Sequence, residues 1–494
     1  MWLTQLLERN RQCRPGRTAL VDEERSVTWA EFHDRTLELA RGLAELGIER
    51  GDRVAVLSKD RIEVLESYFA LARLGALFVP LNHSLAEPEV AGIIKRVGAV
   101  AVIGESELLD RHPELPASVR IRLALDKPAF EALGTLAAER DLPEVADTDP
   151  IAVLHTSATT GQAKGVTVDS GSFRAIALGW LVMARPTDDI VMVNCCPLYH
   201  GSMVVSLTYL AAGATVVLMP GFTPQRALTA VERHRATHMW LVPQMLRFML
   251  QAKASHRTDL SCLREILYGA APMPLDVYAD AVERLGCGFR QVYGMTEVGG
   301  PFVTLGPDEH PAPGDVTARI PCGRVVPGMS ARAVDGGGRE LPPGEIGEIV
   351  VRGPGVMRGY WNDPQATREI TLDGWIRTGD LGFMDDEGRI SLVDRTKDVI
   401  IRAGQNVYPS EIERALLTHP AVRDAAVVGM PDEDYGEVPL AYVVPEPGAA
   451  PGAAALLGHV KGLLAPYKWP RRVEFIEQVP RNPAGKIVKK LLRA

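Results

Sequence analysis

Residues 154–166 bring together side chains that could bind phosphate. A hydrophobic run, 151–154, predicts a strand that leads into a loop with four hydroxyl side chains, two glycines and Lys164. The glycines allow close backbone approach, the hydroxyls can donate to phosphate oxygens, and the lysine adds a positive charge. The spacing is not that of a Walker loop, because Gly165 follows the lysine. Taken alone, this segment is equally compatible with a solvated Ser/Thr/Gly turn.

The composition favours a multidomain globular protein over a nucleic-acid or membrane protein. At 494 residues the chain is too long for one core, and its hydrophobic fraction of 46% is ordinary. A formal net charge of −8 argues against broad nucleic-acid binding. The longest stretch without Lys, Arg, Asp or Glu, 190–225, contains Pro197 and Gly213. It therefore predicts a buried core segment and not a membrane span.

The N-terminus and the cysteines predict a cytoplasmic protein. Glu8 and Arg9 stand where a signal peptide needs its apolar core. The six cysteines form no CxxC pair and have no metal-ligand spacing. Cys195 and Cys196 end an apolar run, which is typical of small buried side chains in a reducing compartment.

Alternating helix and strand patterns predict an α/β fold. Helices are expected at 37–46, 64–74, 204–212 and 224–234, and glycines follow the first two. Short β-branched or apolar runs predict strands at 54–57, 99–103, 121–125, 190–195, 214–219, 238–242, 265–268 and 291–293. This βαβ succession favours parallel sheets covered by helices.

A change of pattern near residue 320 predicts additional structure beyond the α/β body. Short strands at 330–334, 345–352 and 389–393, separated by Gly and Pro, indicate a small antiparallel or barrel-like element. The run Asp385–Gly388 is expected to form a hairpin turn rather than a metal site. The charged cluster 394–398 marks the predicted boundary between a large N-terminal domain, 1–394, and a small mobile α+β domain, 395–494. In that small domain we expect helices at 410–417 and 453–464 and strands at 425–428 and 440–444.

Eight separated stretches occur in an order that resembles the AMP-forming acyl-adenylating superfamily, which includes acyl-CoA synthetases, adenylation domains and luciferases. They are 156–165, Pro197–His200, Gly269–Pro274, Tyr293–Glu297, Arg377–Asp380, Asp394–Arg395, Gly404–Glu413 and Pro480–Lys486. The likeness covers nearly the whole chain, and the connecting text GEIGEIVVRGPGVMRGYW resembles the acyl-CoA synthetase branch. Each motif alone is weak, whereas eight in register are specific.

The resemblance implies a reaction in two halves. A carboxylate attacks the α-phosphate of ATP, which gives an acyl-adenylate and pyrophosphate, and the thiol of coenzyme A then displaces AMP. Phosphoryl transfer needs mainly positioning and charge stabilisation, here by phosphate donors, Mg²⁺ and a cation. By resemblance, the β- and γ-phosphates are bound by Thr156, Ser157, Thr159, Thr160, Gly161 and Lys164. Glu297 would bind Mg²⁺, and Thr296 would contact the α-phosphate.

The remaining nucleotide contacts are implied in the same way. Tyr293 would stack on adenine, and the backbone of Gly269, Ala270 and Ala271 would lie along the other side of the base. Asp380 would take both ribose hydroxyls with help from Arg395.

Three positions of the predicted small domain have the implied roles in catalysis and domain movement. Lys486 would bridge the carboxylate and the α-phosphate, lowering the repulsion between two anions. Lys397 matches the family's hinge position, and Gly404 would line the approach of the thiol.

Each of these residues also has a plain structural explanation. Glu297 could be a surface acid, Asp380 a turn residue, and Lys486 part of a basic tail with Lys489 and Lys490. The order of the motifs favours the functional roles. His200 stands where the family places an aromatic gate to the acyl pocket, and the alternative is a histidine satisfied within the core.

The predicted acyl pocket is apolar and aromatic. It is lined by His200, Met203, Trp240, Tyr268 and Gly294. This lining favours a hydrophobic acid, aromatic, cyclic or of medium chain length, over an α-amino acid. Met203 departs from the family, which often has glycine there, and its longer side chain would shorten or reshape the pocket.

Two further departures fall in the phosphate loop. Ala158 replaces a usual glycine and Ala163 a usual proline, so the loop keeps its donors while its backbone preferences change. We therefore expect retained activity with an altered ATP affinity.

Three functions remain open on the sequence. The first is an acid–CoA ligase, and the second an adenylating enzyme that delivers its acyl group to a carrier protein or an amine. The third is a nucleotide-binding regulatory protein that has lost catalysis, which Lys486 disfavours because pure binding does not need it. No nucleic-acid or membrane partner is expected, and the chain is predicted to be a monomer or a homodimer.

Overall fold

The computed structural model describes residues 1–134, 141–156, 163–199, 201–313, 315, 320–481 and 487–493. They divide into two compact units, of which the first takes the residues up to 330 together with 351–376, and the second takes 331–350 and those from 377 onward. The second unit thus includes short strands that precede the predicted boundary at 394/395. That boundary rests on the charged cluster 394–398 and stays a prediction.

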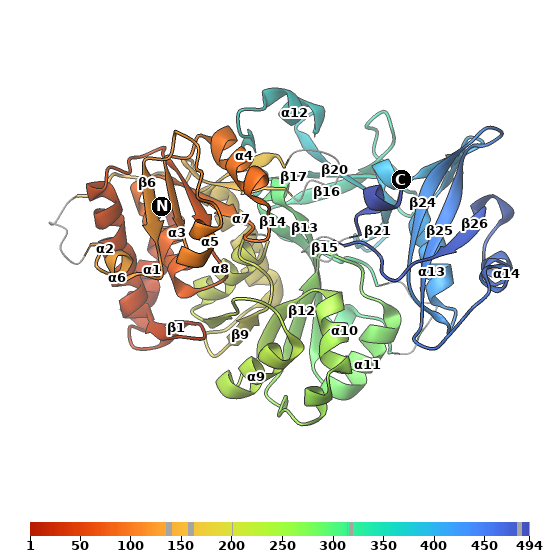
Figure 1. Cartoon of the computed structure of the whole chain (residues 1–494), viewed down its shortest axis with the longest axis horizontal. Helices are drawn as coiled ribbons and strands as arrows, with labels where there is room; N and C mark the ends of the chain where they lie inside the picture. Colours follow the sequence, from red (N-terminus) through yellow and green to blue (C-terminus); the bar gives the residue numbers. More distant parts are fainter. Residues whose placement is uncertain are drawn as a thin grey trace. The chain divides into compact units, whose positions relative to one another are not determined.

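The first unit contains a sheet with the strand order β15-β14-β13-β12-β11-β9-β10-β1-β2 (Figure 1). Its neighbours are parallel from β13 to β1 and antiparallel at both ends. The strands are β1 (Thr18–Val21), β2 (Ser26–Thr28), β9 (Val191–Asn194), β10 (Thr215–Leu218), β11 (His238–Leu241), β12 (Glu265–Gly269), β13 (Gly288–Met295), β14 (Gly300–Leu305) and β15 (Arg324–Val325). The parallel run confirms the βαβ interpretation.

A second sheet of this unit has the order β18-β8-β7-β4-β3-β5-β6. Its strands are β3 (Arg53–Leu57), β4 (Leu77–Leu81), β5 (Ala101–Gly104), β6 (Ile121–Ala124), β7 (Pro150–His155), β8 (Gly165–Asp169) and β18 (Gly359–Tyr360). Strands β7 and β8 form an antiparallel hairpin whose connection contains the predicted phosphate loop. The sequence predicted the first of these strands but not the return strand.

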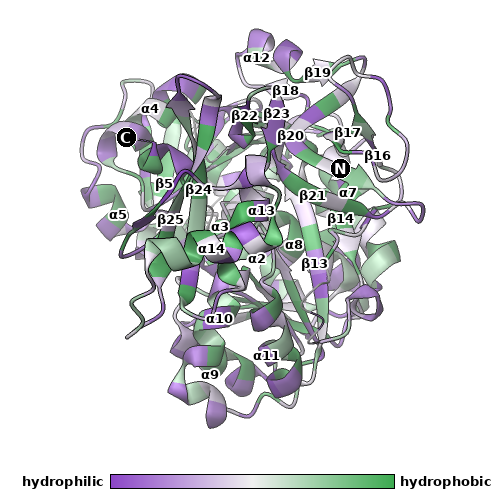
Figure 2. Ribbon diagram, turned by 90° about the vertical axis from the view of Figure 1, so that its right-hand side faces the viewer, coloured by the Kyte–Doolittle hydropathy of each residue, from purple (hydrophilic) through white to green (hydrophobic). Residues whose placement is uncertain are grey.

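Helices cover the parallel strands of both sheets. They are α1 (Trp2–Cys13), α2 (Trp29–Glu45), α3 (Ile62–Leu74), α4 (Glu87–Val97), α5 (Ser106–Asp110), α6 (Pro128–Glu131), α7 (Ser170–Ala184), α8 (Ser202–Ala212), α9 (Pro224–His234), α10 (Pro243–Gln251) and α11 (Leu275–Leu285). A further short helix, α12 (Pro364–Glu369), packs beside the antiparallel strand β18. Figure 2 shows green and purple alternating along α9 and α11, as expected for helices that bury one face.

Local capping explains where two of these helices begin and end. Thr28 Oγ1 accepts from the backbone N–H of Glu31 over 3.2 Å, and the glutamate carboxylate accepts from Thr28 N over 2.7 Å. This capping box begins α2 at Trp29, before the first residue that periodicity identified. Helix α3 ends at Gly75, whose φ of 67° is costly for a residue with a Cβ.

Two smaller sheets complete the fold. One has the order β16-β17-β20-β19, with β21 pairing β20, and the other has the order β23-β22-β25-β24, with β26 pairing β25. Their strands are β16 (Ser330–Val334), β17 (Gly347–Arg352), β19 (Thr371–Leu372), β20 (Trp375–Met384), β21 (Ile390–Arg395), β22 (Ile400–Arg402), β23 (Gln405–Val407), β24 (Val422–Asp432), β25 (Gly436–Pro445) and β26 (Arg472–Phe475). They confirm the predicted small β element and the α+β composition of the C-terminal part.

The C-terminal core lies between the last sheet and two helices, α13 (Pro409–Leu417) and α14 (Ala453–Leu463). The hairpin turn predicted at Asp385–Gly388 is present between β20 and β21, because Asp385 N donates to Arg389 O and Gly388 N to Asp385 O. Among the described residues, no helix is both long and apolar enough to cross a membrane.

Candidate active site

The base of the predicted phosphate loop is closed by hydrogen bonds between Thr156 and Lys164. The backbone N–H of Thr156 donates to the carbonyl of Lys164 over 3.0 Å, and Lys164 N donates to Thr156 Oγ1 over 3.3 Å. The predicted phosphate ligands Ser157, Thr159, Thr160 and Gly161, and the departure Ala158, lie outside the described residues. The two predicted phosphate ligands that are described, Thr156 and Lys164, lie opposite each other at the open end of the β7–β8 hairpin.

His155 supplies no positive charge beside this loop. It ends β7, and burial lowers the pKa of its imidazole to about 4, with a smaller contribution from Arg96. The ring is therefore neutral near pH 7. On the described part of the hairpin's open end, the positive charge comes from Lys164.

Tyr360 joins Lys164 to Glu297. The ammonium of Lys164 lies 4.8 Å from the centroid of the tyrosine ring, and the tyrosine hydroxyl donates to Glu297 Oε1 over 2.7 Å. Burial raises the pKa of Tyr360, and the neighbouring Glu297 carboxylate raises it further, so the hydroxyl keeps its proton. Tyr360 lies outside the motifs from which functional residues were predicted. Its only sequence signal was its place in the family-like text that ends at Trp361.

The donor set around Glu297 suits a magnesium ion that arrives with phosphate. Glu297 follows Thr296 in a short 3₁₀ turn directly after β13, and its side chain is buried. Among the described residues, no group of three or more His, Cys, Asp or Glu side chains could hold a metal by itself. Mg²⁺ is commonly held by one or two carboxylates together with substrate phosphates, so a single carboxylate beside a phosphate loop fits it.

The ends of β12 and β13 bring the predicted adenine contacts to one region. Gly269 pairs with Val292 in the parallel ladder, one residue before Tyr293. A Cβ on Gly269 would come within 2.4 Å of Val292 O, so the close approach of the two strands requires glycine. Ala270 adopts a φ of 65°, and the chain turns away from the sheet there.

The structure separates two residues that we expected in one acyl pocket. Trp240 pairs with Leu267 of β12, and its side chain lies on the face of the sheet that α8 covers, since Tyr209 of that helix contacts His238. Tyr268 points to the opposite face, into a core with Met239. Its hydroxyl hydrogen-bonds Gln291 and His310 there, so Tyr268 does not lie beside Trp240. The other described lining candidates are Met203, buried on α8, and Gly294, in β13.

Asp60 anchors the segment that leads to His200. The backbone N–H of Leu198 lies 2.9 and 3.2 Å from the two oxygens of Asp60, which is 6% exposed. Burial raises the pKa of this carboxyl to about 8, and the hydrogen bond from Leu198 lowers it only partly. His200 lies outside the described residues. Asp60 was missed because an acid shortly after a strand is common in loops.

In the second unit, the predicted ribose ligands are neighbours. Asp380 and Arg395 are cross-strand partners in β20 and β21, and Arg395 Nε lies 3.4 Å from Asp380 Oδ1. The backbone N–H of Asp380 donates to Thr378 Oγ1 over 3.1 Å. The ladder therefore places a carboxylate and a guanidinium together, as the resemblance implied.

Lys397 and Gly404 follow this pair along the chain. Lys397 lies in a 3₁₀ turn directly after β21, and burial lowers the pKa of its ammonium, with a further contribution from Arg395. Gly404 lies in the tight turn between β22 and β23, where Ala403 and Gly404 have φ values of 48° and 79°. Two successive positive φ values are those of a type I′ hairpin turn, so Gly404 has a structural requirement besides its predicted role.

Lys486 lies outside the described residues, but the chain on both sides of 482–486 is anchored. Arg481 and Ile487 form an antiparallel bridge, and Val488 N donates to Pro480 O over 2.8 Å. Arg481 also pairs with both oxygens of Asp424, at 3.0 and 2.9 Å. Ile487 packs on a buried cluster of β24 and β25, so the residue after Lys486 belongs to an ordered part of the second unit.

Comparisons with known proteins cover almost the whole chain. Residues 7–361 match the model of a family described as AMP-binding enzyme, and residues 411–486 match the AMP-binding enzyme C-terminal domain. The fatty acid–[acyl-carrier-protein] ligase ScoC of Streptomyces coeruleorubidus is 36% identical over 501 residues, covering 99% of this chain and 96% of that protein. The feruloyl-CoA synthase of an Amycolatopsis species is 37% identical over 483 residues, covering 97% and 96%. The crystal structure of ATP-bound MatB from Rhodopseudomonas palustris superposes with a TM-score of 0.91 at 31% identity, covering 99% and 98%.

Proposed function

The chain belongs to the family of AMP-binding enzymes, and from this premise we propose that it joins a hydrophobic carboxylic acid to coenzyme A. The carboxylate attacks the α-phosphate of ATP and releases pyrophosphate, and the thiol then displaces AMP from the acyl-adenylate. Similarity along almost the entire chain to a CoA ligase, feruloyl-CoA synthase, is the observation that carries this proposal.

The first unit would bind the phosphates of ATP. Lys164 brings a positive charge to the open end of the β7–β8 hairpin, where Thr156 contributes a hydroxyl. Glu297 would hold Mg²⁺, which neutralises phosphate charge when it is bound. The family-implied contacts of Thr296 with the α-phosphate and of Tyr293 with adenine belong to the same proposal. These residues lie at the ends of β7, β8 and β13, where rigid strands would position them.

The second unit would supply the ribose contact and the catalytic cation. Asp380 can accept from two hydroxyls, and the adjacent Arg395 holds its carboxylate in place. Lys486 would bridge the two reacting anions and stabilise the charge that develops as they meet. The next residue, Ile487, is partly buried and packs against the buried cluster of β24 and β25.

A rotation of residues 395–494 would separate the two half-reactions. Lys397, directly after β21, is the proposed hinge, since hinge residues at the ends of elements absorb backbone change. Gly404 would then line the path of the thiol. The tight turn that holds Gly404 presents a position with no Cβ and with open space around it.

The acid itself is proposed to be aromatic, cyclic or of medium chain length. Trp240 and Met203 are both buried, at 5% and 1% exposed, and α8 covers the face of the sheet on which Trp240 lies. A large ring and a flexible thioether favour an apolar acyl group over a charged one.

A panel of carboxylic acids tests this function. The protein is incubated with ATP, Mg²⁺ and each acid, with and without coenzyme A, and the products are read by mass spectrometry. We expect an acyl-CoA from hydrophobic acids. Best rates with free amino acids would contradict the proposed acid class.

A second acceptor is favoured by one specific similarity. The ligase ScoC, which its name describes as acting on an acyl-carrier protein, is nearly as similar to this chain as the CoA ligase is. The alternative function is therefore transfer to a carrier protein or an amine. An adenylate that persists in the panel when coenzyme A is present would support this alternative.

Lys486→Ala tests the catalytic assignment. We expect adenylate formation to fall by about 10²–10³-fold, because a preorganised charge at the reacting centre is lost. ATP binding should change little, since the phosphate loop is intact. Pyrophosphate release gives the first quantity and titration calorimetry the second. Lys490→Ala, in the same basic segment, is the matched control, and equal rates in all three proteins would refute the assignment.

A further inference from the structure

Tyr360 contacts both charged side chains of the proposed ATP site in the first unit. Its hydroxyl donates to Glu297 Oε1 over 2.7 Å, and Lys164 Nζ lies 4.8 Å from its ring centroid. Opposite charges attract, yet in the described part of the chain no salt bridge joins Lys164 to Glu297. The tyrosine therefore holds the cation on its ring and the anion on its hydroxyl.

The backbone on both sides of Tyr360 is fixed to the same two regions. In β18, Tyr360 pairs with Val166 of β8, and Trp361 N donates to the carbonyl of Gly165 over 2.7 Å. Three residues before the tyrosine, Met357 N donates to the carbonyl of Glu297 over 2.9 Å. The segment 357–361 thus ties the backbone beside Lys164 to the backbone of Glu297, and the side chain of Tyr360 repeats this connection.

We infer that Tyr360 is a positioning residue for the magnesium–ATP complex, an inference that rests on the proposed function. Its hydroxyl donates to Oε1 of Glu297 and orients the carboxylate, which would hold the metal when it is bound. Hydrogen-bond partners of metal ligands act in this way and influence metal affinity strongly. Its ring attracts the ammonium of Lys164 without neutralising it, because a cation–π contact involves no counter-charge.

The two parts of the side chain have separable effects. A direct ion pair between Lys164 and Glu297 would take the cation from the phosphates and the ligand from the metal. Loss of the hydroxyl alone releases the carboxylate but leaves the ammonium over an aromatic ring. Loss of the ring releases both side chains, so they can then pair with each other.

The experiment measures ATP binding by titration calorimetry at a series of Mg²⁺ concentrations, without any acid. For Tyr360→Phe we expect the Mg²⁺ concentration needed for half-maximal binding to rise about tenfold. Its ATP affinity at saturating Mg²⁺ should stay near that of the unmodified protein. For Tyr360→Leu we expect the same rise together with a loss of about threefold in ATP affinity at saturating Mg²⁺.

Two controls separate positioning from a general structural effect. Tyr278 lies on α11, and its partly buried hydroxyl donates to Pro311 O over 3.3 Å. Tyr278→Phe removes this hydroxyl and should leave the Mg²⁺ requirement unchanged. In a Glu297→Ala background, Tyr360→Phe should have no further effect, since its acceptor is gone.

Each outcome bears on a distinct claim. No ATP binding by the unmodified protein would refute the proposed function and this inference with it. Mg²⁺-dependent binding that is identical in Tyr360→Phe would overturn the inference alone. If Tyr360→Leu does not fold, the Tyr360→Phe and Glu297→Ala pair still decides the role of the hydroxyl.

Discussion

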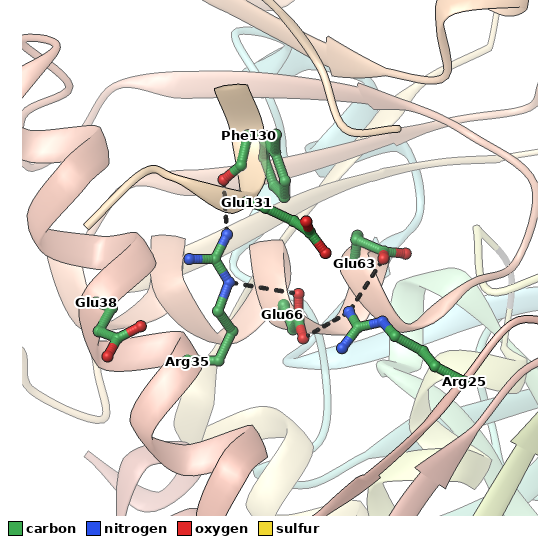
Figure 3. Close-up of a pocket in the computed structure, with 7 residues that line it drawn as sticks. All are labelled: Arg25, Arg35, Glu38, Glu63, Glu66, Phe130 and Glu131. Atoms are coloured by element: carbon green, nitrogen blue, oxygen red, sulfur yellow. Dashed lines mark hydrogen bonds and ion pairs between the residues drawn. The ribbon is translucent and has the colours of Figure 1, made fainter. Parts of the chain in front are cut away.

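Two buried glutamates of the first unit have opposite surroundings. Glu66 of α3, with a side chain 1% exposed, accepts from Arg25 over 2.9 Å, and Arg35 Nε lies 3.9 Å from its other oxygen. Figure 3 shows these side chains around a pocket of about 310 Å³. Glu297 is also buried, but its partner is the neutral hydroxyl of Tyr360, and among the residues described here no cation forms a salt bridge with it.

The difference indicates which carboxylate is structural. A buried charge is tolerated when a counter-charge and hydrogen bonds compensate it, and Arg25 does this for Glu63 as well as for Glu66. Burial raises the pKa of Glu66, and Arg25 partly offsets that effect. Among the described residues Glu297 has no such counter-charge, as its proposed role as a Mg²⁺ ligand requires. In Figure 3 the carboxylates of Glu63 and Glu66 have arginine partners within the chain, whereas the described contact of Glu297 is with a neutral hydroxyl.

Arg25→Ala tests the structural half of this comparison and has the largest expected effect. It removes the shared cation of the buried carboxylates Glu63 and Glu66, while Arg61 still pairs with Glu63. We therefore expect the unfolding free energy to fall by about 3 kcal/mol, the lower end of the cost of breaking a buried ion pair. Urea denaturation measures the change. The matched control is Arg11→Ala, whose pair with Asp34 is about half exposed on both sides and should contribute less than about 1 kcal/mol. Equal losses in the two variants would break the comparison.

Asp60→Asn tests whether burial without a cationic partner is enough to keep a carboxyl group protonated. Asp60 has no cation in its hydrogen bonds, and its pKa in the folded protein is about 8 against an ordinary 3.8. Between these two pKa values the folded state holds a proton that the unfolded state has released, so the contribution of Asp60 to stability is fully present below about pH 4 and is lost as the pH rises through about 8.

The asparagine variant should lack that pH dependence. Between about pH 6 and 8 we expect the unmodified protein to lose about 2 kcal/mol more than Asp60→Asn. Urea denaturation at each pH gives both values. Parallel stability curves for the two proteins would show that Asp60 is ionised in the folded state, and burial without a cation would then not suffice to keep a proton.

The sequence predicted the elements around these carboxylates better than the carboxylates' partners. Helix α3 and strand β21 appear where periodicity and β-branched runs placed them, because those patterns report which face of an element is buried. The start of α2 was missed because the capping box of Thr28 and Glu31 is a short polar signal outside the apolar repeat. Family order, not periodicity, pointed to Glu297 and Asp380.

What could not be predicted is contact between distant segments. Nothing in the local sequence brings Tyr360 to Glu297, since that requires β18 to pair with β8. The face of the sheet on which a side chain lies is equally hard to predict, because a shift of one residue along a strand moves it to the other face. Trp240 and Tyr268 lie in adjacent strands but on opposite faces. Ion pairs such as Arg25 with Glu66 depend on the same long-range packing.

Glu297→Ala tests the other half of the comparison and should have the smallest effect on stability. It removes one hydrogen bond but also one uncompensated buried carboxylate, so the free energy of unfolding should change by about 1 kcal/mol or less. The effects on ATP binding should be the opposite. Glu297→Ala should lose its Mg²⁺-dependent affinity for ATP, whereas the folded molecules of Arg25→Ala should retain it. Urea denaturation measures the stability of both variants, and titration calorimetry measures their affinity for ATP. A stability loss in Glu297→Ala as large as that in Arg25→Ala would make both glutamates structural, because a carboxylate reserved for a ligand contributes to binding and not to the fold.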